Sequence, residues 1–323
     1  MTQCLPINAE SLAKAEELLR AGQLVAFPTE TVYGLGADAR NAVAVASIFA
    51  AKKRPSFNPL ISHVADKDAA FSFGLRTPLA EILADAFWPG PLTLILQRLS
   101  DCPIAGITSA GLDKIALRVP AHDGARALLT AFNGPIAAPS ANPSGRISPS
   151  RAEHVLALMD EDLPLVLDGG ACISGLESTV VDCTGDQVVL LRPGGITRAM
   201  LASALSEAGA SSAIVTAPPI TGTQSPISPG QLESHYAPNS KVRLNAALPQ
   251  IGETFIGFGQ TSLGDNGLNL SKDGDLLEAA ANLFDMLHIA DSEATSAIAV
   301  APIPNIGLGE AINDRLKRAS APR

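Results

Sequence analysis

Residues 52–60 combine three consecutive cations with two prolines, in a chain whose formal net charge is −9. The prolines favour a turn after Lys52, Lys53 and Arg54. Arginine can bind two phosphate oxygens at once, whereas lysine acts as a point charge, so the cluster suits a polyphosphate, with Asn58 as a polar neighbour. Cations are also favoured at the C-terminal end of a helix, so a solvated helix end is the alternative.

Polar residues gather in four further segments, each close to an apolar run. The segments are residues 28–36, residues 139–145, residues 177–180 with Arg192 downstream, and residues 228–230 with residues 235–238. Loops that follow strands commonly bind ligands in α/β folds, and glycines in the first segment are expected to let the backbone approach a ligand closely. Each segment is also explained as a capped turn, a proline turn, a surface ion pair or a solvated loop.

A sheet is needed to bring these segments together, and apolar periodicity predicts one. Strands are predicted at 24–27, 60–64, 92–96, 115–119, 135–138, 163–167, 179–182 and 188–191, and helices after Asn8, after Asn41 and at 78–87, 123–132 and 149–159. Ser148 and Pro149 form a good N-cap and N1 pair for the last helix. Because neighbouring strands near 163–191 break the βαβ rhythm, we predict an α/β fold with a twisted mixed sheet flanked by helices.

The composition changes after Ala208. Residues 209–230 carry no charge and are rich in Ala, Ser, Thr, Pro and Gly, which is typical of a linker. Strands at 241–245, 254–258 and 297–300 and helices at 275–290 and 308–318 predict a small Rossmann-like α/β domain. The predicted organisation is a catalytic domain at 1–208, a linker or lid at 209–239 and a C-terminal domain at 240–323.

Composition narrows the classes of function. The four cysteines are scattered and form no C-x-x-C pair, so neither a zinc site nor a disulfide framework is expected. No apolar run approaches membrane-spanning length and the first residues lack an apolar leader, so a cytoplasmic protein is predicted. The acidic balance argues against tight, nonspecific nucleic-acid binding by the whole chain.

In combination, the polar segments resemble the threonylcarbamoyl-AMP synthases of the YrdC type. That family shows the motifs P-T-E-T-x-Y-G-L-G, K-x-R-P-x-x-N-P-L, R-V-P, S-A-N, E-S-T-V and R-P-G, which match here at residues 28–36, 52–60, 118–120, 140–142, 177–180 and 192–194. The long form adds an S-P-G…H-Y-x-P linker and a small C-terminal domain, which residues 307–316 also resemble. The order and spacing of the motifs make the resemblance specific, and it covers nearly the whole chain.

The resemblance implies an enzyme that joins L-threonine, bicarbonate and ATP into L-threonylcarbamoyl-AMP and releases pyrophosphate. The product supplies the threonylcarbamoyl group of adenosine 37 in tRNAs that read ANN codons. No covalent enzyme intermediate is implied, so the task of the protein is to position two anions and to stabilise charge. The implied partners are the proteins that transfer the product to tRNA, and contact with tRNA itself is expected to be weak or indirect.

Residue roles follow from motif matching alone. Lys52 and Arg54 are the expected catalytic phosphate clamp. The expected ATP site contains Lys52, Arg54, Asn58, Ser140, Asn142, Ser148, Arg192, Ser228, His235 and Tyr236, and the expected L-threonine site contains Thr29, Thr31, Tyr33, His63, Arg118 and Ser178. Arg118 is expected to bind the threonine carboxylate, and Lys53 has no expected role. Mg²⁺ is expected with the ATP phosphates, without protein ligands, and no prosthetic group is expected.

Two alternatives stay open from the sequence. One is an RNA-binding module without catalysis, because the related domain has a basic concave face. The other is a carbamoyl transferase of the hydrogenase-maturation type, although such proteins carry additional zinc-finger-like and acylphosphatase-like modules.

Overall fold

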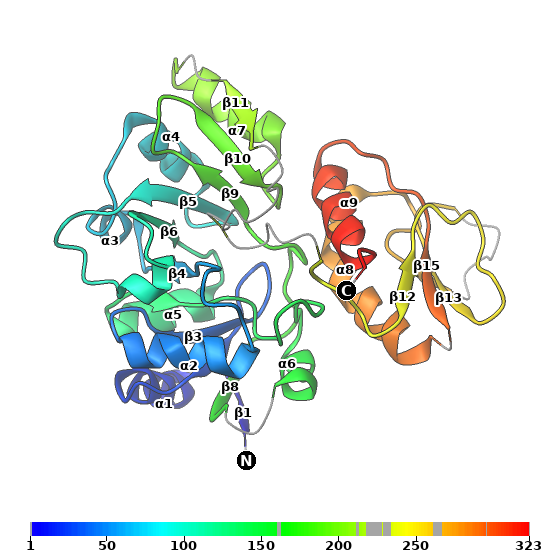
Figure 1. Cartoon of the computed structure of the whole chain (residues 1–323), viewed down its shortest axis with the longest axis horizontal. Coiled ribbons are helices and arrows are strands. Elements are labelled where there is room, and N and C mark those ends of the chain that lie inside the picture. The colour runs from blue at the N-terminus through cyan, green and yellow to red at the C-terminus, as the bar shows by residue number, and fades with distance from the viewer. Residues whose placement is uncertain are drawn as a thin grey trace.

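The computed structural model describes residues 2–159, 163–210, 213–217, 228, 234–260, 267–294 and 296–322. The chain forms a large part and a smaller C-terminal part, which lie side by side (Figure 1). Within the described ranges, no helix has both the length and the apolar character needed to cross a membrane.

The large part is built on a twisted mixed sheet, as predicted. Its strands are β1 (Gln3–Pro6), β2 (Val25–Phe27), β3 (Gly34–Asp38), β4 (Ile61–His63), β5 (Leu92–Gln97), β6 (Lys114–Arg118), β7 (Ile136–Ala137), β8 (Leu165–Asp168), β9 (Thr179–Asp182), β10 (Val188–Arg192) and β11 (Ile214–Thr216). They lie in the order β1-β8-β2-β3-β7-β4-β6-β5-β9-β10-β11. The sheet contains both parallel pairs, such as β4–β6, and antiparallel pairs, such as β5–β6.

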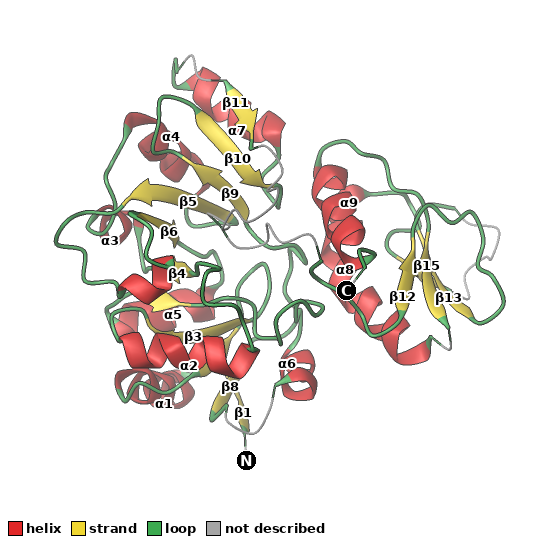
Figure 2. Cartoon of the chain, in the orientation of Figure 1, coloured by secondary structure: helices red, strands yellow, loops and turns green. Residues whose placement is uncertain are grey.

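Helices cover both faces of this sheet, as Figure 2 shows. They are α1 (Ala9–Arg20), α2 (Ala42–Lys52), α3 (Lys67–Phe71), α4 (Pro78–Phe87), α5 (Asp123–Phe132), α6 (Ala152–Leu158) and α7 (Arg198–Glu207), with a 3₁₀ turn at Gly106–Ser109. Buried residues of α2, α4 and α7 pack on one face, whereas those of α1 and α5 pack on the other face near β2 and β8. Asparagine and threonine side chains cap α1, α2 and α4, which explains where these helices begin.

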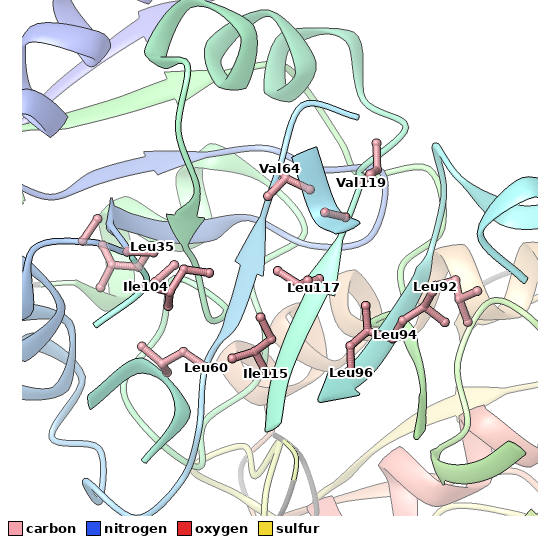
Figure 3. Packing of buried hydrophobic residues seen from close by; sticks show 14 of the residues in the cluster. Leu35, Leu60, Val64, Leu92, Leu94, Leu96, Ile104, Ile115, Leu117 and Val119 are labelled. Atoms are coloured by element: carbon pink, nitrogen blue, oxygen red, sulfur yellow. The ribbon is translucent and has the colours of Figure 1, made fainter. Parts of the chain in front are cut away.

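The first face forms a continuous aliphatic layer. Leu94 and Leu96 of β5 lie beside Ile115 and Leu117 of β6 in this layer (Figure 3). The alternate residues of the same strands, such as Ile95 and Ala116, point to the opposite face. That second cluster consists of strand residues with Ala217 at its margin. Because no described helix residue belongs to this cluster, the face of the sheet over β4, β5, β6, β9 and β10 leaves room for a cavity.

The last three residues of the predicted ligand loop at 28–36 belong to strand β3. β3 pairs antiparallel with both β2 and β7. A side-chain carbon at Gly36 would lie 2.8 Å from the ring of Phe27 and 3.0 Å from Ile136. Gly36 is therefore required for close packing inside the sheet, whereas Gly34, the other glycine of the predicted ligand loop, lines a cavity.

The predicted N-cap at Ser148 was also wrong. Helix α6 begins at Ala152, with Arg151 at the N-cap position. The Ser148 hydroxyl instead donates to Glu177, and the carbonyl of Pro149 accepts from the amide of Tyr33. These long-range partners hold the segment away from the helix, and local capping preferences carry no information about them.

The small part is an all-parallel α/β sheet. Strands β12 (Lys241–Arg243), β13 (Glu253–Gly257), β14 (Leu268–Asn269) and β15 (Ala297–Val300) lie in the order β12-β15-β13-β14, with α8 (Leu276–Glu293) and α9 (Leu308–Ala319). Both helices lie between this sheet and the large part in Figure 1. Of the segment predicted as a linker, residues 214–216 form the edge strand β11 of the large sheet.

A buried ion pair joins the two parts. Arg315 of α9 is fully buried, and its Nε donates to Oε2 of Glu177 over 2.8 Å. Further contacts across the interface join Arg198 to Glu310 and Arg151 to Asp285, and stack His154 on His288 at a ring separation of 3.9 Å. Glycine is required at Gly175, because a Cβ there would lie 2.3 Å from the carbonyl oxygen of Ala280.

We expect Arg315→Met to lower the free energy of unfolding by about 3–5 kcal/mol, because it leaves the buried Glu177 carboxylate without its partner. Arg198→Met is the matched control, since it breaks an interdomain pair whose side chains are both 34% exposed and should cost less than about 1 kcal/mol. Urea unfolding followed by circular dichroism measures both. Equal losses of unfolding free energy in the two variants would contradict the larger contribution expected from the buried Arg315–Glu177 pair.

The same pair predicts a pH dependence. Burial alone would raise the pKa of Glu177, but the charges of Arg315 and Arg192 and the Ser148 hydrogen bond hold it below its ordinary value. The stabilisation is therefore present above the unfolded-state pKa of about 4.3 and is lost as the pH falls through the lower folded-state pKa. The stability difference between the wild type and Arg315→Met should shrink below about pH 4, and a constant difference would contradict this.

Candidate functional site

A cavity of about 50 Å³ lies at one edge of the large sheet. The carboxyl ends of the parallel strands β4 and β6 meet there, with the start of β9 and the end of β10 alongside. The lining residues are Thr29, Thr31, Val32, Gly34, Arg54, Ile61, His63, Arg118, Ala138, Pro139, Ser140, Glu177, Ser178, Arg192, His235 and Tyr236. Strand ends thus bring together segments that are far apart in the sequence.

One end of the cavity is formed by the 29–32 turn and Arg118. The hydroxyl of Thr29 donates to the carbonyl of Val32 over 2.7 Å and lies 2.8 Å from the hydroxyl of Thr31, so the turn holds itself together. Nη1 of Arg118 donates to the Thr31 hydroxyl over 3.0 Å. Nη2 of Arg118 lies 2.6 Å from Oε1 of Glu30, and both side chains are about 5% exposed. A planar, paired guanidinium in this position can receive a carboxylate.

His63 completes this end of the cavity as a neutral group. Its backbone pairs with that of Arg118 across β4 and β6. Burial, and then the charge of Arg118, lowers the pKa of His63 to about 3. Nδ1 of this buried ring has no hydrogen-bond partner within the described residues. The imidazole can therefore hydrogen-bond a ligand at neutral pH without adding charge.

The other end of the cavity is basic. Arg192 donates from Nε and Nη2 to the carbonyl of Ser178, at 3.1 and 2.9 Å, and from Nη2 to its hydroxyl. Arg54 donates to the carbonyls of Asn58 and Pro59. Burial lowers the pKa of Arg54 to about 10, and the nearby Arg192 contributes in the same direction. Among the described residues neither guanidinium forms a direct ion pair, although the charge of Glu177 is felt at Arg192. Two guanidiniums held by carbonyls suit an anion with several oxygens.

Lys52 lies behind the cavity wall. Its Nζ is fully buried and donates to the carbonyl oxygens of Ser140 and Asn142. Burial, and then the charge of Arg54, lowers its pKa. The lysine therefore holds the 140–142 turn against α2. Lys53 is exposed and ends α2 in the left-handed conformation, with φ at 50°, as the helix-end explanation predicted.

Glu177 and Arg315 belong to the site, although no role was predicted for either residue. Oε1 of Glu177 accepts from the Ser148 hydroxyl over 2.6 Å, and Oε2 accepts from Arg315. Glu177 lines the cavity, so Arg315 of α9 is linked to the cavity through Glu177. The only signals in the sequence were the E-S-T-V segment and Arg315 inside residues 307–316. Glu30, within the P-T-E-T motif, was missed in the same way.

His235 and Tyr236 close the cavity from the linker side. Both side chains are buried, with ring centroids 4.1 Å apart, and Tyr236 also lies under the guanidinium of Arg315. The neighbouring Ala237 amide donates to the carbonyl of Gly145, which fastens this end of the linker to the large part. Ser228 is buried, and most residues around it in the sequence lie outside the described ranges.

Several predicted site residues lie outside the cavity lining. Lys52, Asn142 and Ser148 hold the wall from behind, and Asn58 supports Arg54 through its carbonyl. Tyr33 donates from its hydroxyl to the carbonyl of Gly170 and is fully buried. The remaining predicted residues, apart from Ser228, line the cavity: Thr29, Thr31, Arg54, His63, Arg118, Ser140, Ser178, Arg192, His235 and Tyr236.

Unpartnered polar atoms concentrate around this cavity. In the described part of the chain, both amide atoms of Asn58, Oδ1 of Asn142, Nδ1 of His235 and the hydroxyl of Tyr236 are buried without a hydrogen-bond partner. Buried polar groups are almost always hydrogen-bonded, so these atoms point to a bound polar ligand or water.

The donor set does not make a protein-held metal site. No group of three or more His, Cys, Asp or Glu side chains suited to a metal lies within the described ranges. Of the described lining residues, Glu177 alone is acidic, and its two oxygens are engaged by Ser148 and Arg315. The cavity therefore fits oxyanions better than a directly coordinated cation.

Comparison with known proteins identifies the family of this chain. Residues 17–194 match the Sua5/YciO/YrdC family model, described as "Telomere recombination", and residues 196–321 match "Threonylcarbamoyl-AMP synthase, C-terminal domain". A threonylcarbamoyl-AMP synthase of Bacillus subtilis is 38% identical over 340 residues, covering 100% of this chain and 96% of the relative. One from Pyrococcus abyssi is 38% identical over 326 residues, covering 96% and 94%.

Two solved structures extend the comparison. The crystal structure of P. abyssi Sua5 complexed with L-threonine has a TM-score of 0.88 at 35% identity, and covers 99% of this chain and 98% of its own. Full-length HypF, in a phosphate- and nucleotide-bound form, has a TM-score of 0.51 at 18% identity over 58% of this chain and 29% of its own, which shows a shared fold alone. The chain belongs to the Sua5/YciO/YrdC family, in the form that carries the C-terminal domain of threonylcarbamoyl-AMP synthases.

Proposed function

We propose that this enzyme makes L-threonylcarbamoyl-AMP and pyrophosphate from L-threonine, bicarbonate and ATP, for modification of adenosine 37 in tRNAs that read ANN codons. The observation that carries the proposal is the full-length match to threonylcarbamoyl-AMP synthases and to a Sua5 complexed with L-threonine. The cavity supports it, because a carboxylate-binding end around Arg118 lies next to a basic end around Arg54 and Arg192.

The reaction needs positioning more than a protein nucleophile. The threonine amine takes up carbon dioxide derived from bicarbonate and loses a proton, which gives a carbamate. A carbamate oxygen then attacks the α-phosphorus of ATP, and the bond to pyrophosphate breaks. In this proposal Arg118 binds the threonine carboxylate, while Arg54 and Arg192 stabilise the negative charge that develops on the phosphate oxygens.

The linker acts in this proposal as a lid. The cavity, at about 50 Å³, is much smaller than the roughly 300–1,000 Å³ of typical ligand sites, and the buried side chains of His235 and Tyr236 line it. ATP therefore enters when these residues move out, and their return excludes water from the carbamate. Ser228 is proposed to join them at the ATP phosphates.

Other parts of the proposal concern the surroundings of the reaction. Mg²⁺ is proposed to arrive with the ATP phosphates, without protein ligands, and no step is assigned to it. The product is proposed to pass to threonylcarbamoyl-transferase proteins in the cytoplasm, with weak or indirect contact to tRNA. Weak contact with tRNA is supported by the net charge of −9, because an acidic protein repels the phosphates of RNA. Most of the described cations at the site are also buried and so are not exposed to RNA.

The purified protein should release pyrophosphate from ATP only when both L-threonine and bicarbonate are present. A coupled phosphate assay after pyrophosphatase treatment measures the release, and mass spectrometry identifies the adenylate. Release that is independent of threonine, or tight tRNA binding without any turnover, would overturn the proposed function.

Arg118→Gln should raise the KM for L-threonine about 30- to 150-fold, while the KM for ATP changes little. A charged hydrogen-bond pair to the carboxylate contributes about 2–3 kcal/mol, which corresponds to that factor. The exposed Arg126, changed to Gln, is the control and should keep wild-type kinetics. A rise in the KM for ATP alone would show that Arg118 binds ATP and not threonine, and would refute this assignment.

Arg54→Ala and Lys52→Ala should each reduce kcat at least about 100-fold, because one stabilises developing charge directly and the other holds the 140–142 turn. Lys52→Ala should also lower the melting temperature, since it removes the donor to two buried carbonyl groups. Lys53→Ala changes an exposed neighbour and serves as the control. Near-wild-type turnover in either of the first two variants would refute the clamp.

A further inference from the structure

Glu30 is a buried carboxylate that the reaction does not require as an acid, base or nucleophile. Its Oε1 lies 2.6 Å from Nη2 of Arg118, and its Oε2 accepts from the amide of Ala121 over 3.1 Å. Its backbone carbonyl accepts from the amide of Ser174. The residue is therefore fixed from both ends, and its side chain is absent from the described lining of the cavity.

The pair orients Arg118. Nε of this arginine lies 3.4 Å from the carbonyl of Gly90, Nη1 donates to Thr31, and Nη2 is paired with Glu30. Of the two terminal nitrogens, Nη1 donates to Thr31, whereas Nη2 is held by charge at 2.6 Å from Glu30 and makes no hydrogen bond within the described residues, so N–H groups remain for a ligand. The plane of the guanidinium is thus set before any ligand arrives, which reduces the ordering cost of binding.

The pair also sets the charge at this end of the cavity. Arg118 contributes one positive charge and Glu30 one negative charge, while His63 is neutral because burial and Arg118 keep its pKa at about 3. A free α-amino acid is a zwitterion, whose carboxylate needs the guanidinium and whose ammonium is repelled by it. In the neutral pair, Arg118 still attracts the carboxylate of the amino acid. The negative charge of Glu30, which lies slightly farther away, cancels the repulsion between Arg118 and the ammonium group.

We propose that Glu30 is a positioning and specificity-determining residue, which orients Arg118 and selects a zwitterionic amino acid over a simple carboxylate anion. The proposal rests on the proposed function, in which Arg118 receives the threonine carboxylate. Glu30 acts through Arg118, because its own side chain lies outside the described lining of the cavity.

Steady-state kinetics of Glu30→Gln test the proposal, with 3-hydroxybutanoate as the probe anion. This molecule keeps the carboxylate, hydroxyl and methyl groups of threonine and lacks the amine. We expect the KM for L-threonine to rise about tenfold, the inhibition constant of 3-hydroxybutanoate to stay constant or fall, and the KM for ATP to stay within twofold. Equal weakening of threonine and 3-hydroxybutanoate, or no change in either, overturns the proposal.

Glu253→Gln is the matched control, because Glu253 also pairs with an arginine at 2.6 Å, in the C-terminal part far from the cavity. It should change none of these constants. If Glu30→Gln does not fold, Glu30→Asp is the deciding variant. It keeps the negative charge but is one methylene shorter, so Arg118 must shift to keep the ion pair. The KM for threonine should then rise severalfold, while the inhibition constant of 3-hydroxybutanoate stays as in the wild type. A wild-type KM in Glu30→Asp overturns the proposal.

Two outcomes separate this proposal from the proposed function. If Arg118→Gln leaves the KM for threonine unchanged, the assignment of the threonine site fails and the role of Glu30 fails with it. If Arg118→Gln weakens threonine and Glu30→Gln does not, only the role of Glu30 fails. In the double variant, Glu30→Gln should add no further loss to Arg118→Gln, because residues that act through one another are not additive.

Discussion

The burial of several cations at one edge of the sheet is the constraint on which the rest of this structure depends. Lys52, Arg54, Arg118 and Arg192 are all less than about a tenth exposed. An isolated charge taken out of water is very costly, so each must find partners inside the fold. Much of the architecture around the cavity supplies those partners.

The partners differ in a way that matches two kinds of ligand. Lys52, Arg54 and Arg192 are held by backbone carbonyls, which satisfy their hydrogen bonds and leave their charge available. Arg118 is instead neutralised by Glu30. The first arrangement suits a polyphosphate with several negative charges, and the second suits a zwitterion. The strand order of the mixed sheet places the two environments next to each other, as a reaction between an amino-acid carbamate and ATP requires.

The C-terminal part enters the same electrostatic network. Arg315 reaches across the interface to Glu177, and Glu177 holds Ser148 at the edge of the cavity. Tyr236, at the described end of the linker, packs against both Arg315 of α9 and Phe284 of α8. The second domain and the described end of the linker, at His235 and Tyr236, therefore belong to the site itself, because buried charges and rings connect them to the cavity.

The sequence by itself determined the mixed α/β class, most helices and strands, and the set of polar motifs, because those depend on local periodicity and residue type. It placed Lys53 correctly at a helix end for the same reason. It could not show that Gly36 is needed for close packing against Phe27, because that contact depends on the tertiary structure. For the same reason it could not show that the Ser148 hydroxyl donates to Glu177 and does not cap a helix. The roles of Glu30 and Arg315 were decided only by the tertiary structure, since a carboxylate or guanidinium acquires its partner when folding removes both from water.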